Sequence, residues 1–98
     1  QAVYRTGRSC ANKYLVMYIK ENECGRNRLG ISVSKKVGNS IVRHRLTRLI
    51  RESYRLNEER FRCGLDMVVI ARAGAKERSY HEIESALLHL GRLHEIID

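Results

Sequence analysis

Apolar side chains gather in three short runs that are typical of strands. Residues 14–19 (YLVMYI) are rich in aromatic and β-branched side chains, and a short pairing segment is expected before them near residues 9–11. Residues 29–34 (LGISVS) alternate apolar with small or polar positions, as a half-buried strand does. Residues 67–71 (MVVIA) are apolar without alternation, which is typical of a strand covered on both faces. The pattern predicts a sheet of about four strands.

A helical period replaces this pattern after residue 40. The apolar positions that recur at helical spacing are Val42, Leu46, Leu49 and Ile50. They form one stripe on a 3.6-residue wheel, which predicts an amphipathic helix that ends near residue 56 or 57. Asn39 or Ser40 can cap its N-terminus.

The two ends of the chain also have helix signals. Ser79 and Glu82 have the spacing of a capping box, which predicts that a last helix begins there. That helix is expected to bury Ile83, Leu87 and Leu90, with Ala86 and Leu93 beside them. Residues 1–6 are expected to be the tail of a first helix that ends at Gly7. Because Gln1 is not an initiator methionine, we expect the earlier part of this helix to be missing from the sequence.

The predicted order is helix, strands, helix, strand, helix. The polar segment 21–27 contains Gly25 and is interpreted as a hairpin loop between two strands. No repeat, proline or low-complexity linker divides residues 1–98, so one domain is expected. The sequence predicts an α+β fold, a small α/β sandwich in which helices pack against one mixed sheet.

The positive net charge of the chain indicates which kind of partner it binds. The net charge of +8 indicates a polyanionic partner, with nucleic acid first and an anionic membrane surface second. No apolar run approaches the roughly 20 residues that span a bilayer, and no signal-peptide core is visible. The widely spaced Cys10, Cys24 and Cys63 argue against a disulfide framework or a zinc site and favour reduced cytoplasmic thiols.

The central helix concentrates the positive charge on one side. The face opposite the apolar stripe has His44, Arg48, Arg51 and Arg55, with Arg43 and Arg45 on its flanks. A solvated helix face normally mixes acids with bases, yet no acid occurs from residue 35 to residue 51. Guanidinium groups can each donate two parallel hydrogen bonds to a phosphate. This helix is therefore interpreted as a surface for a nucleic acid.

No catalytic constellation accompanies the basic helix. The chain has two aspartates and nine scattered glutamates, whereas a two-metal nuclease needs clustered carboxylates. His81, His89 and His94 share the last helix at spacings that do not converge on one site, so surface or partly packed histidines are expected. No catalytic or metal-ligating residue is predicted.

The central segment GISVSKKVGNSIVRHRLTRLIRE strongly resembles the signature of the bacterial ribonuclease P protein subunit. In that family an Arg-Asn-Arg core follows a Ser-x-Lys-Lys-x-Gly-Asn stretch. The resemblance extends to Gly7, Ala11, Asn12, Val16 and Tyr18 in the first strands and to residues 66–72 in the last strand. His44 stands where the family usually has Asn, Thr47 where it has Lys, and Tyr4 where it often has Phe.

The resemblance implies a specific function. In the family the RNA subunit is the catalyst and uses magnesium ions to remove the 5′ leader of precursor tRNA. The small basic protein binds that RNA and the leader, and no cofactor is implied for the protein alone. The RNA-binding residues implied or predicted for this chain are Lys35, Lys36, Arg43, His44, Arg45, Arg48, Arg51 and Arg55. The leader cleft, between sheet and first helix, is implied at Tyr4, Val16 and Tyr18.

The resemblance also implies the element order αβββαβα and a left-handed βαβ crossover, although general rules favour a right-handed one. Without the family, Val16 and Tyr18 are more simply interpreted as sheet core.

Two other classes of protein stay open on the sequence. One is a structural RNA-binding protein, such as a ribosomal component of similar architecture. The other is a DNA-binding repressor that places the basic helix in a major groove, although this helix has few Asn or Gln residues to bind base edges. Recovery of one structured RNA in a salt-stable pull-down, with a cleavage assay on that RNA, separates the three.

Overall fold

The computed structural model describes residues 7–23 and 25–97 of the chain. Its strands and longer helices, in chain order, are β1 (Arg8–Ala11), β2 (Leu15–Glu21), β3 (Arg28–Ser32), α2 (Ser40–Asn57), β4 (Leu65–Ala71) and α3 (Tyr80–Leu93). Two short 3₁₀ turns, Glu58–Arg60 and Ala73–Ala75, flank β4. The predicted strands and the two later helices are confirmed with shifts of a few residues, and the first helix, predicted in residues 1–6, lies outside the described residues.

The four strands form one mixed sheet in the order β1-β2-β4-β3. β1 and β2 are antiparallel, β2 and β4 are antiparallel, and β3 and β4 are parallel. Because β4 lies between β2 and β3, the prediction of a hairpin at residues 21–27 is wrong. This segment instead joins two strands that are not neighbours. The hand of the β3–α2–β4 crossover stays a prediction.

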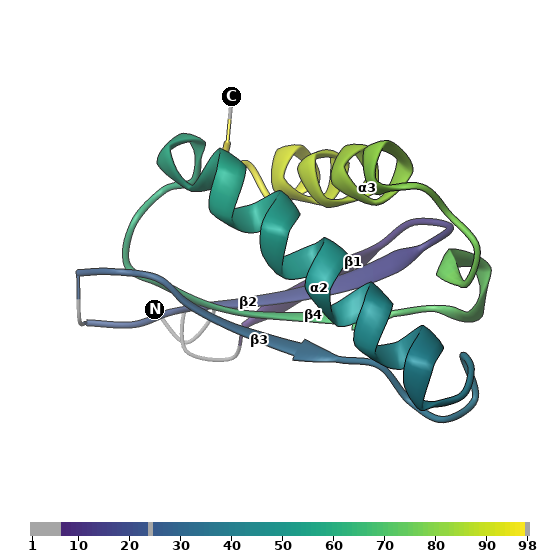
Figure 1. Cartoon of the computed structure of the whole chain (residues 1–98). Coiled ribbons are helices and arrows are strands. Elements are labelled where there is room, and N and C mark those ends of the chain that lie inside the picture. Colours follow the sequence, from purple (N-terminus) through teal and green to yellow (C-terminus); the bar gives the residue numbers. More distant parts are fainter. Residues whose placement is uncertain (1–6, 24, 98) are drawn as a thin grey trace.

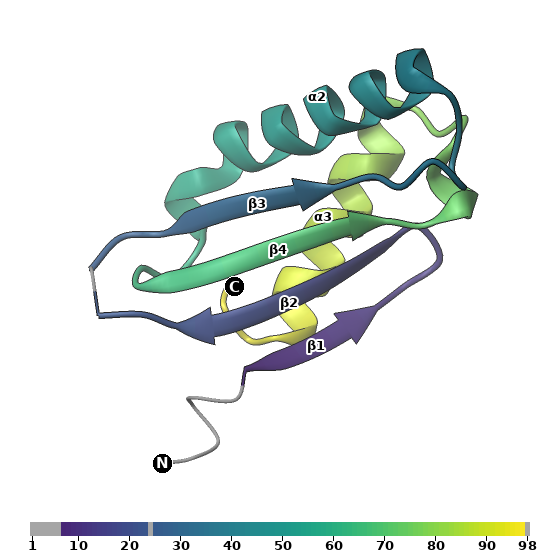
Figure 2. The ribbon, with the colours of Figure 1, turned by 90° about the horizontal axis from the view of Figure 1, so that it is seen from below.

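Both helices cover the same face of the sheet (Figures 1 and 2). The period-2 alternation of β2 and β4 directs one set of side chains toward the helices. The strand residues buried there are Leu15, Met17, Ile19, Leu65, Met67, Val69 and Ala71. Leu46 and Ile50 of α2 and Ile83, Leu87 and Leu90 of α3 pack onto this face and are fully buried. None of the helices in the described part of the chain is long and apolar enough to cross a membrane.

The opposite face of the sheet has no helix over it among the described residues (Figure 2). Val68 of β4 points to this face and is 41% exposed, and Ile70 is half-buried. The prediction that residues 67–71 are covered on both faces is therefore wrong for the described part of the molecule. An uninterrupted apolar run hid the alternation, because the outward positions of β4 are also branched aliphatic residues.

Local contacts fix where α2 begins. The side chain of Asn39 accepts a hydrogen bond from the backbone N–H of Val42 at 3.0 Å, so Asn39, the first of the two predicted candidates, is the N-cap. Gly38 precedes it, and a Cβ there would lie 2.7 Å from the side chain of Val42. The chain can therefore turn into α2 at this close distance only because residue 38 has no side chain.

The start of α3 follows the predicted capping box. Ser79 accepts from the N–H of Glu82 at 3.2 Å, and the Glu82 carboxylate accepts from the N–H of Ser79 at 2.9 Å. Leu93 is 49% exposed, so the prediction that it lies beside the buried stripe is wrong. The last turn of α3 instead packs through Gly91, where Phe61 and Ile97 approach closely.

Candidate nucleic-acid interface

The outward face of α2 is open to a partner along most of its length. His44, Arg48 and Arg51 are exposed, as the helical wheel predicted. Two shallow hollows lie on this face and share Arg48. The first, of about 570 Å³, is lined by Ser40, Ile41, His44, Arg45 and Arg48, and the second by Arg48, Leu49, Arg51 and Glu52. Within the described residues, Arg48 and Arg51 have no hydrogen bond or ion pair to another side chain. Their guanidinium groups are available to a ligand.

The two flanking arginines have different surroundings. Arg45 donates to the backbone oxygen of Arg78 at 2.7 Å and lies 3.5 Å from that of Lys76, so it connects α2 to the turn before α3. Arg43 is half-buried, and its Nε has no hydrogen-bond partner in the described structure. A buried N–H without a partner costs free energy. This atom is buried, so a ligand on the surface of α2 does not reach it in the described structure.

Arg55, at the C-terminal end of the face, already has a partner. Its Nη2 lies 2.6 Å from Oε2 of Glu52 and its Nε 3.2 Å from Oε1. This ion pair raises the pKa of Arg55 and lowers the pKa of Glu52. The guanidinium of Arg55 is therefore less available to an anionic ligand than those of Arg48 and Arg51.

The N-terminal end of α2 adds positive charge without a compensating acid. Lys35 and Lys36 are exposed in the turn that Val37 closes by donating to the backbone oxygen of Ser34 at 3.1 Å. No acidic residue occupies the first turn of α2, so the positive end of the helix dipole is not neutralised there. Thr47 donates to the backbone oxygen of Arg43 at 2.9 Å and is half-buried. Its hydroxyl therefore does not offer a partner the charged donor that a lysine at this position would offer.

The uncovered face of the sheet is a second candidate surface. Tyr18 is 49% exposed on it and Val16 is half-buried, so the simpler interpretation of Tyr18 as sheet core is wrong. The register pairs Tyr18 with Val68, and Val68 with Gly30 on the next strand. Tyr4, the third residue implied for the cleft, lies outside the described residues.

Sequence reasoning missed Val68, Gly30 and the ion pair at the edge of this face. Arg28 donates to both carboxylate oxygens of Asp66, at 2.8 and 2.9 Å, and Asn22 donates to the same carboxylate. These donors lower the pKa of Asp66, with the Arg28 hydrogen bonds as the largest cause. Alternation within β4 places Val68 on the face opposite the core. The sequence shows which face that is only if β4 is known to pair with β2.

The histidines do not form a catalytic pair. His81 and His89 are exposed as predicted, whereas His94 is buried, which corrects the expectation for that residue. Its Nε2 lies 2.9 Å from the backbone oxygen of Met17 and its Nδ1 4.0 Å from the thiol of Cys10. Cys10 and Cys63 are free thiols, and Cys24 lies outside the described residues. Across residues 7–23 and 25–97, no three His, Cys, Asp or Glu side chains are placed to hold a metal ion.

The sequence matches known proteins over nearly its whole length. The family model described as ribonuclease P matches residues 1–94. A protein of Lachnoclostridium phytofermentans named ribonuclease P protein component is 66% identical over 95 residues, which cover 97% of this chain and 82% of the relative. The protein of the same name from Alkaliphilus metalliredigens is 57% identical, and the match covers 97% of this chain and 86% of that one.

Solved structures agree with the sequence matches. The structure of the Staphylococcus aureus RNase P protein at 2.0 Å superimposes with a TM-score of 0.86 at 36% identity and covers 100% of this chain and 90% of that one. The Thermotoga maritima RNase P protein superimposes with a TM-score of 0.82 at 33% identity, covering 88% of this chain and 83% of that one.

Proposed function

The chain belongs to the ribonuclease P protein family, and we propose that it binds the RNA subunit of ribonuclease P through the outward face of α2. In this proposal the RNA subunit cuts the 5′ leader from precursor tRNA with its own magnesium ions. The protein supplies no catalytic group, and residues 1–98 act as one RNA-binding domain in the cytoplasm.

The observation that carries the proposal is the availability of Arg48 and Arg51. Both are exposed on a helix face that has no acid before Glu52, and neither has a side-chain partner in the described structure. A row of free guanidinium groups at the spacing of helix turns can follow a phosphate backbone. Arg45 fits this role less directly, because two backbone oxygens already occupy its guanidinium.

Substitution of the two free arginines tests the proposal. Arg48→Ala and Arg51→Ala are each expected to weaken binding of the RNA subunit by about 1.5–3 kcal/mol, the range for a charge-assisted hydrogen bond. Both side chains point away from the core, so thermal unfolding should stay close to that of the parent. Filter binding measures the affinity, and Arg55→Ala is the matched control because Glu52 already pairs with Arg55. Parent-like affinity of both variants would contradict the proposal.

A cleavage assay tests whether the RNA subunit, and not the protein, cuts precursor tRNA. We expect the protein alone to cut no precursor tRNA, and to increase leader removal by the RNA subunit at low magnesium. Robust cleavage by RNA-free, nuclease-free protein would overturn this part.

For the leader, the proposal assigns the uncovered face of the sheet. Unpaired bases stack on exposed aromatic rings, and Tyr18 offers one ring there beside the aliphatic Val16 and Val68. Support comes from the exposure of Tyr18, since a residue of the sheet core would be covered.

A further inference from the structure

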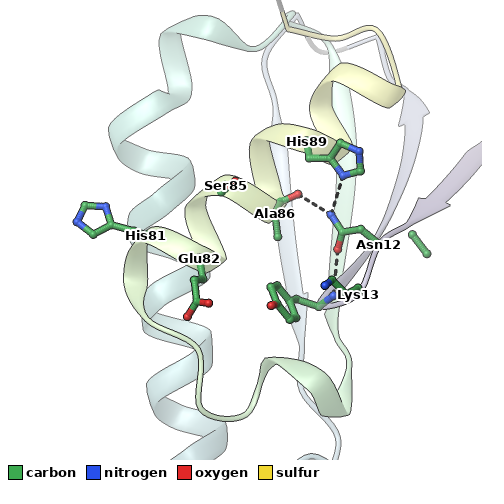
Figure 3. A pocket seen from close by; sticks show the side chains of 9 residues that line it. Asn12, Lys13, His81, Glu82, Ser85, Ala86 and His89 are labelled. Carbon is green, nitrogen blue, oxygen red and sulfur yellow. Dashed lines mark hydrogen bonds between the residues drawn. The ribbon is translucent and has the colours of Figure 1, made fainter.

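A pocket outside both proposed RNA surfaces lies between the β1–β2 turn and α3 (Figure 3). Its volume is about 580 Å³, within the range of pockets that hold small organic ligands. Residues of the turn form one wall, and the first two-thirds of α3 forms the other. The lining residues used below are Asn12, Lys13, Tyr14, Glu82, Ser85 and His89.

The side chain of Asn12 holds the two walls together. Its amide nitrogen donates to the backbone oxygen of Ala86 at 2.9 Å and to Nδ1 of His89 at 3.1 Å (Figure 3). Its amide oxygen accepts from the backbone N–H groups of Tyr14 and Leu15 at 3.1 and 3.0 Å. The pocket is therefore formed before any ligand arrives, and a ligand would not have to order the turn.

The pocket offers hydrogen-bond donors at Lys13 and His89, and the hydroxyls of Tyr14 and Ser85 can donate or accept. The carbonyl of Ala86 can only accept, which fixes the orientation of the Asn12 amide, and His89 must then accept at Nδ1 and carry its proton at Nε2. Lys13 is an exposed ammonium group. The one acid, Glu82, is occupied because its two oxygens accept from the N–H of Ser79 and from Arg78. The pocket therefore favours an anionic ligand.

The pocket also has an aromatic wall, and it is connected to the surface of α2. The guanidinium of Arg78 lies over the ring of Tyr14, 5.5 Å from its centre. The backbone oxygen of the same Arg78 accepts from Arg45 of α2 at 2.7 Å. Arg45 thus connects the hollow at Arg48, through the backbone oxygens of Lys76 and Arg78, to the residue whose guanidinium borders the pocket.

We propose that this pocket holds an unpaired nucleotide of the same RNA subunit that binds α2. The base lies against Tyr14 and Ala86, and the phosphate accepts from Lys13 and from Nε2 of His89. An aromatic wall with cationic donors at its edge is the combination that binds single-stranded nucleotides. This inference rests on the proposed function, because it extends the RNA surface of α2.

Two variants test the charge and the space separately. Lys13→Gln removes the ammonium group, and Ser85→Leu places a larger side chain at an exposed position of α3 that lines the pocket. Arg26→Gln is the matched control, because Arg26 is exposed in the loop after β2, at the end of the sheet away from the pocket. We expect both pocket variants to bind ribonuclease P RNA several-fold more weakly than Arg26→Gln. Lys13→Gln should also reduce the salt dependence of binding by about one phosphate contact.

Hydroxyl-radical footprinting on the same RNA adds a second measurement. Ser85→Leu should expose one short RNA segment while the segment protected by α2 stays protected. The inference is overturned if both pocket variants bind and footprint like Arg26→Gln, or if they weaken only the binding of precursor tRNA to the assembled complex. Arg48→Ala distinguishes the two failures. If it weakens RNA binding, the inference fails alone, and if it does not, the proposed function fails as well.

Discussion

The exposure of Tyr18 and the residues beside it determine which role its ring can have. Its ring lies on the uncovered face of the sheet, next to Val68 of β4, and Gly30 of β3 follows on the far side of Val68. A Cβ at Gly30 would lie 3.8 Å from the side chain of Val68, an ordinary van der Waals contact, so Gly30 borders the exposed side chain of Val68. The result is an apolar surface beside an exposed ring, which is suited to stacking.

Substitution of Tyr18 separates a stacking role from a structural one. Tyr18→Ala should weaken binding of precursor tRNA by about 1–3 kcal/mol, the range for a lost stack on a base. Binding of mature tRNA and of the RNA subunit should hardly change, because neither contains the leader. Tyr18→Phe is the control, since it keeps the ring. Equal weakening for precursor and mature tRNA would contradict the leader assignment.

The carboxylate of Asp66 predicts a pH dependence of stability. Its pKa is lowered by the hydrogen bonds from Arg28 and Asn22, so the folded state favours the ionised form. This stabilisation is complete above the ordinary carboxyl pKa of about 3.9 and is lost as the pH falls through the lowered value. Between pH 5 and pH 3, the melting temperature of the parent should therefore fall further than that of Asp66→Asn. Parallel melting curves for the two proteins would show that the pair does not stabilise the fold.

At the scale of elements, α2 combines a specified start with an exposed cationic face. Its first turn relies on Asn39 for a cap and on Gly38 for close approach to Val42. Its buried side consists of Leu46, Ile50, Ser53 and Tyr54. The position of the arginines thus depends on packing and capping residues that do not contact a ligand themselves.

Removal of the cap should cost stability without removing a phosphate contact. Asn39→Ala is expected to lower the free energy of unfolding by about 1 kcal/mol, because the N–H of Val42 loses its acceptor. Asn39→Asp keeps an acceptor at this position and should retain most of the stability. Urea denaturation measures both. A parent-like midpoint for Asn39→Ala would show that water satisfies this N–H equally well.

Local patterns predicted the elements well, and pairing across the chain poorly. The helix bounds and caps follow from neighbours a few residues apart, as Asn39 and the Ser79–Glu82 capping box demonstrate. The position of β4 between β2 and β3 depends on contacts more than 30 residues apart, which no local period encodes. The wheel likewise placed Arg45 on the helix flank but could not reveal that its guanidinium donates to the backbone oxygens of Lys76 and Arg78.

At the scale of the whole molecule, the net charge of +8 is distributed unevenly. The arginines paired with acids include Arg28, Arg55 and Arg62, while Arg48 and Arg51 have no acid partner within the described structure. Free charges release more counterions from a nucleic acid than charges already neutralised by an acid. The salt dependence of RNA binding should therefore reflect the unpaired set.

Measurement of affinity against salt concentration tests this distinction. The slope of log affinity against log salt should fall by about 1 for Arg48→Ala and again for Arg51→Ala. Arg55→Ala should change the slope less, because Glu52 already neutralises Arg55. Equal effects of all three substitutions would mean that the Arg55–Glu52 pair opens when RNA binds.

The central position of β4 in the sheet affects how the chain folds during its synthesis. β3 pairs only with β4 in the described sheet, and β4 is synthesised after the whole of α2. A ribosome that has released residues as far as α2 therefore presents β3 with no partner strand, and α2 with an incomplete surface to pack on. Productive folding has to wait for residues 65–71, since distant pairing forms late. Until then the apolar stripe of α2 has no complete sheet to pack against, so the nascent chain exposes Leu46 and Ile50, which the folded protein buries.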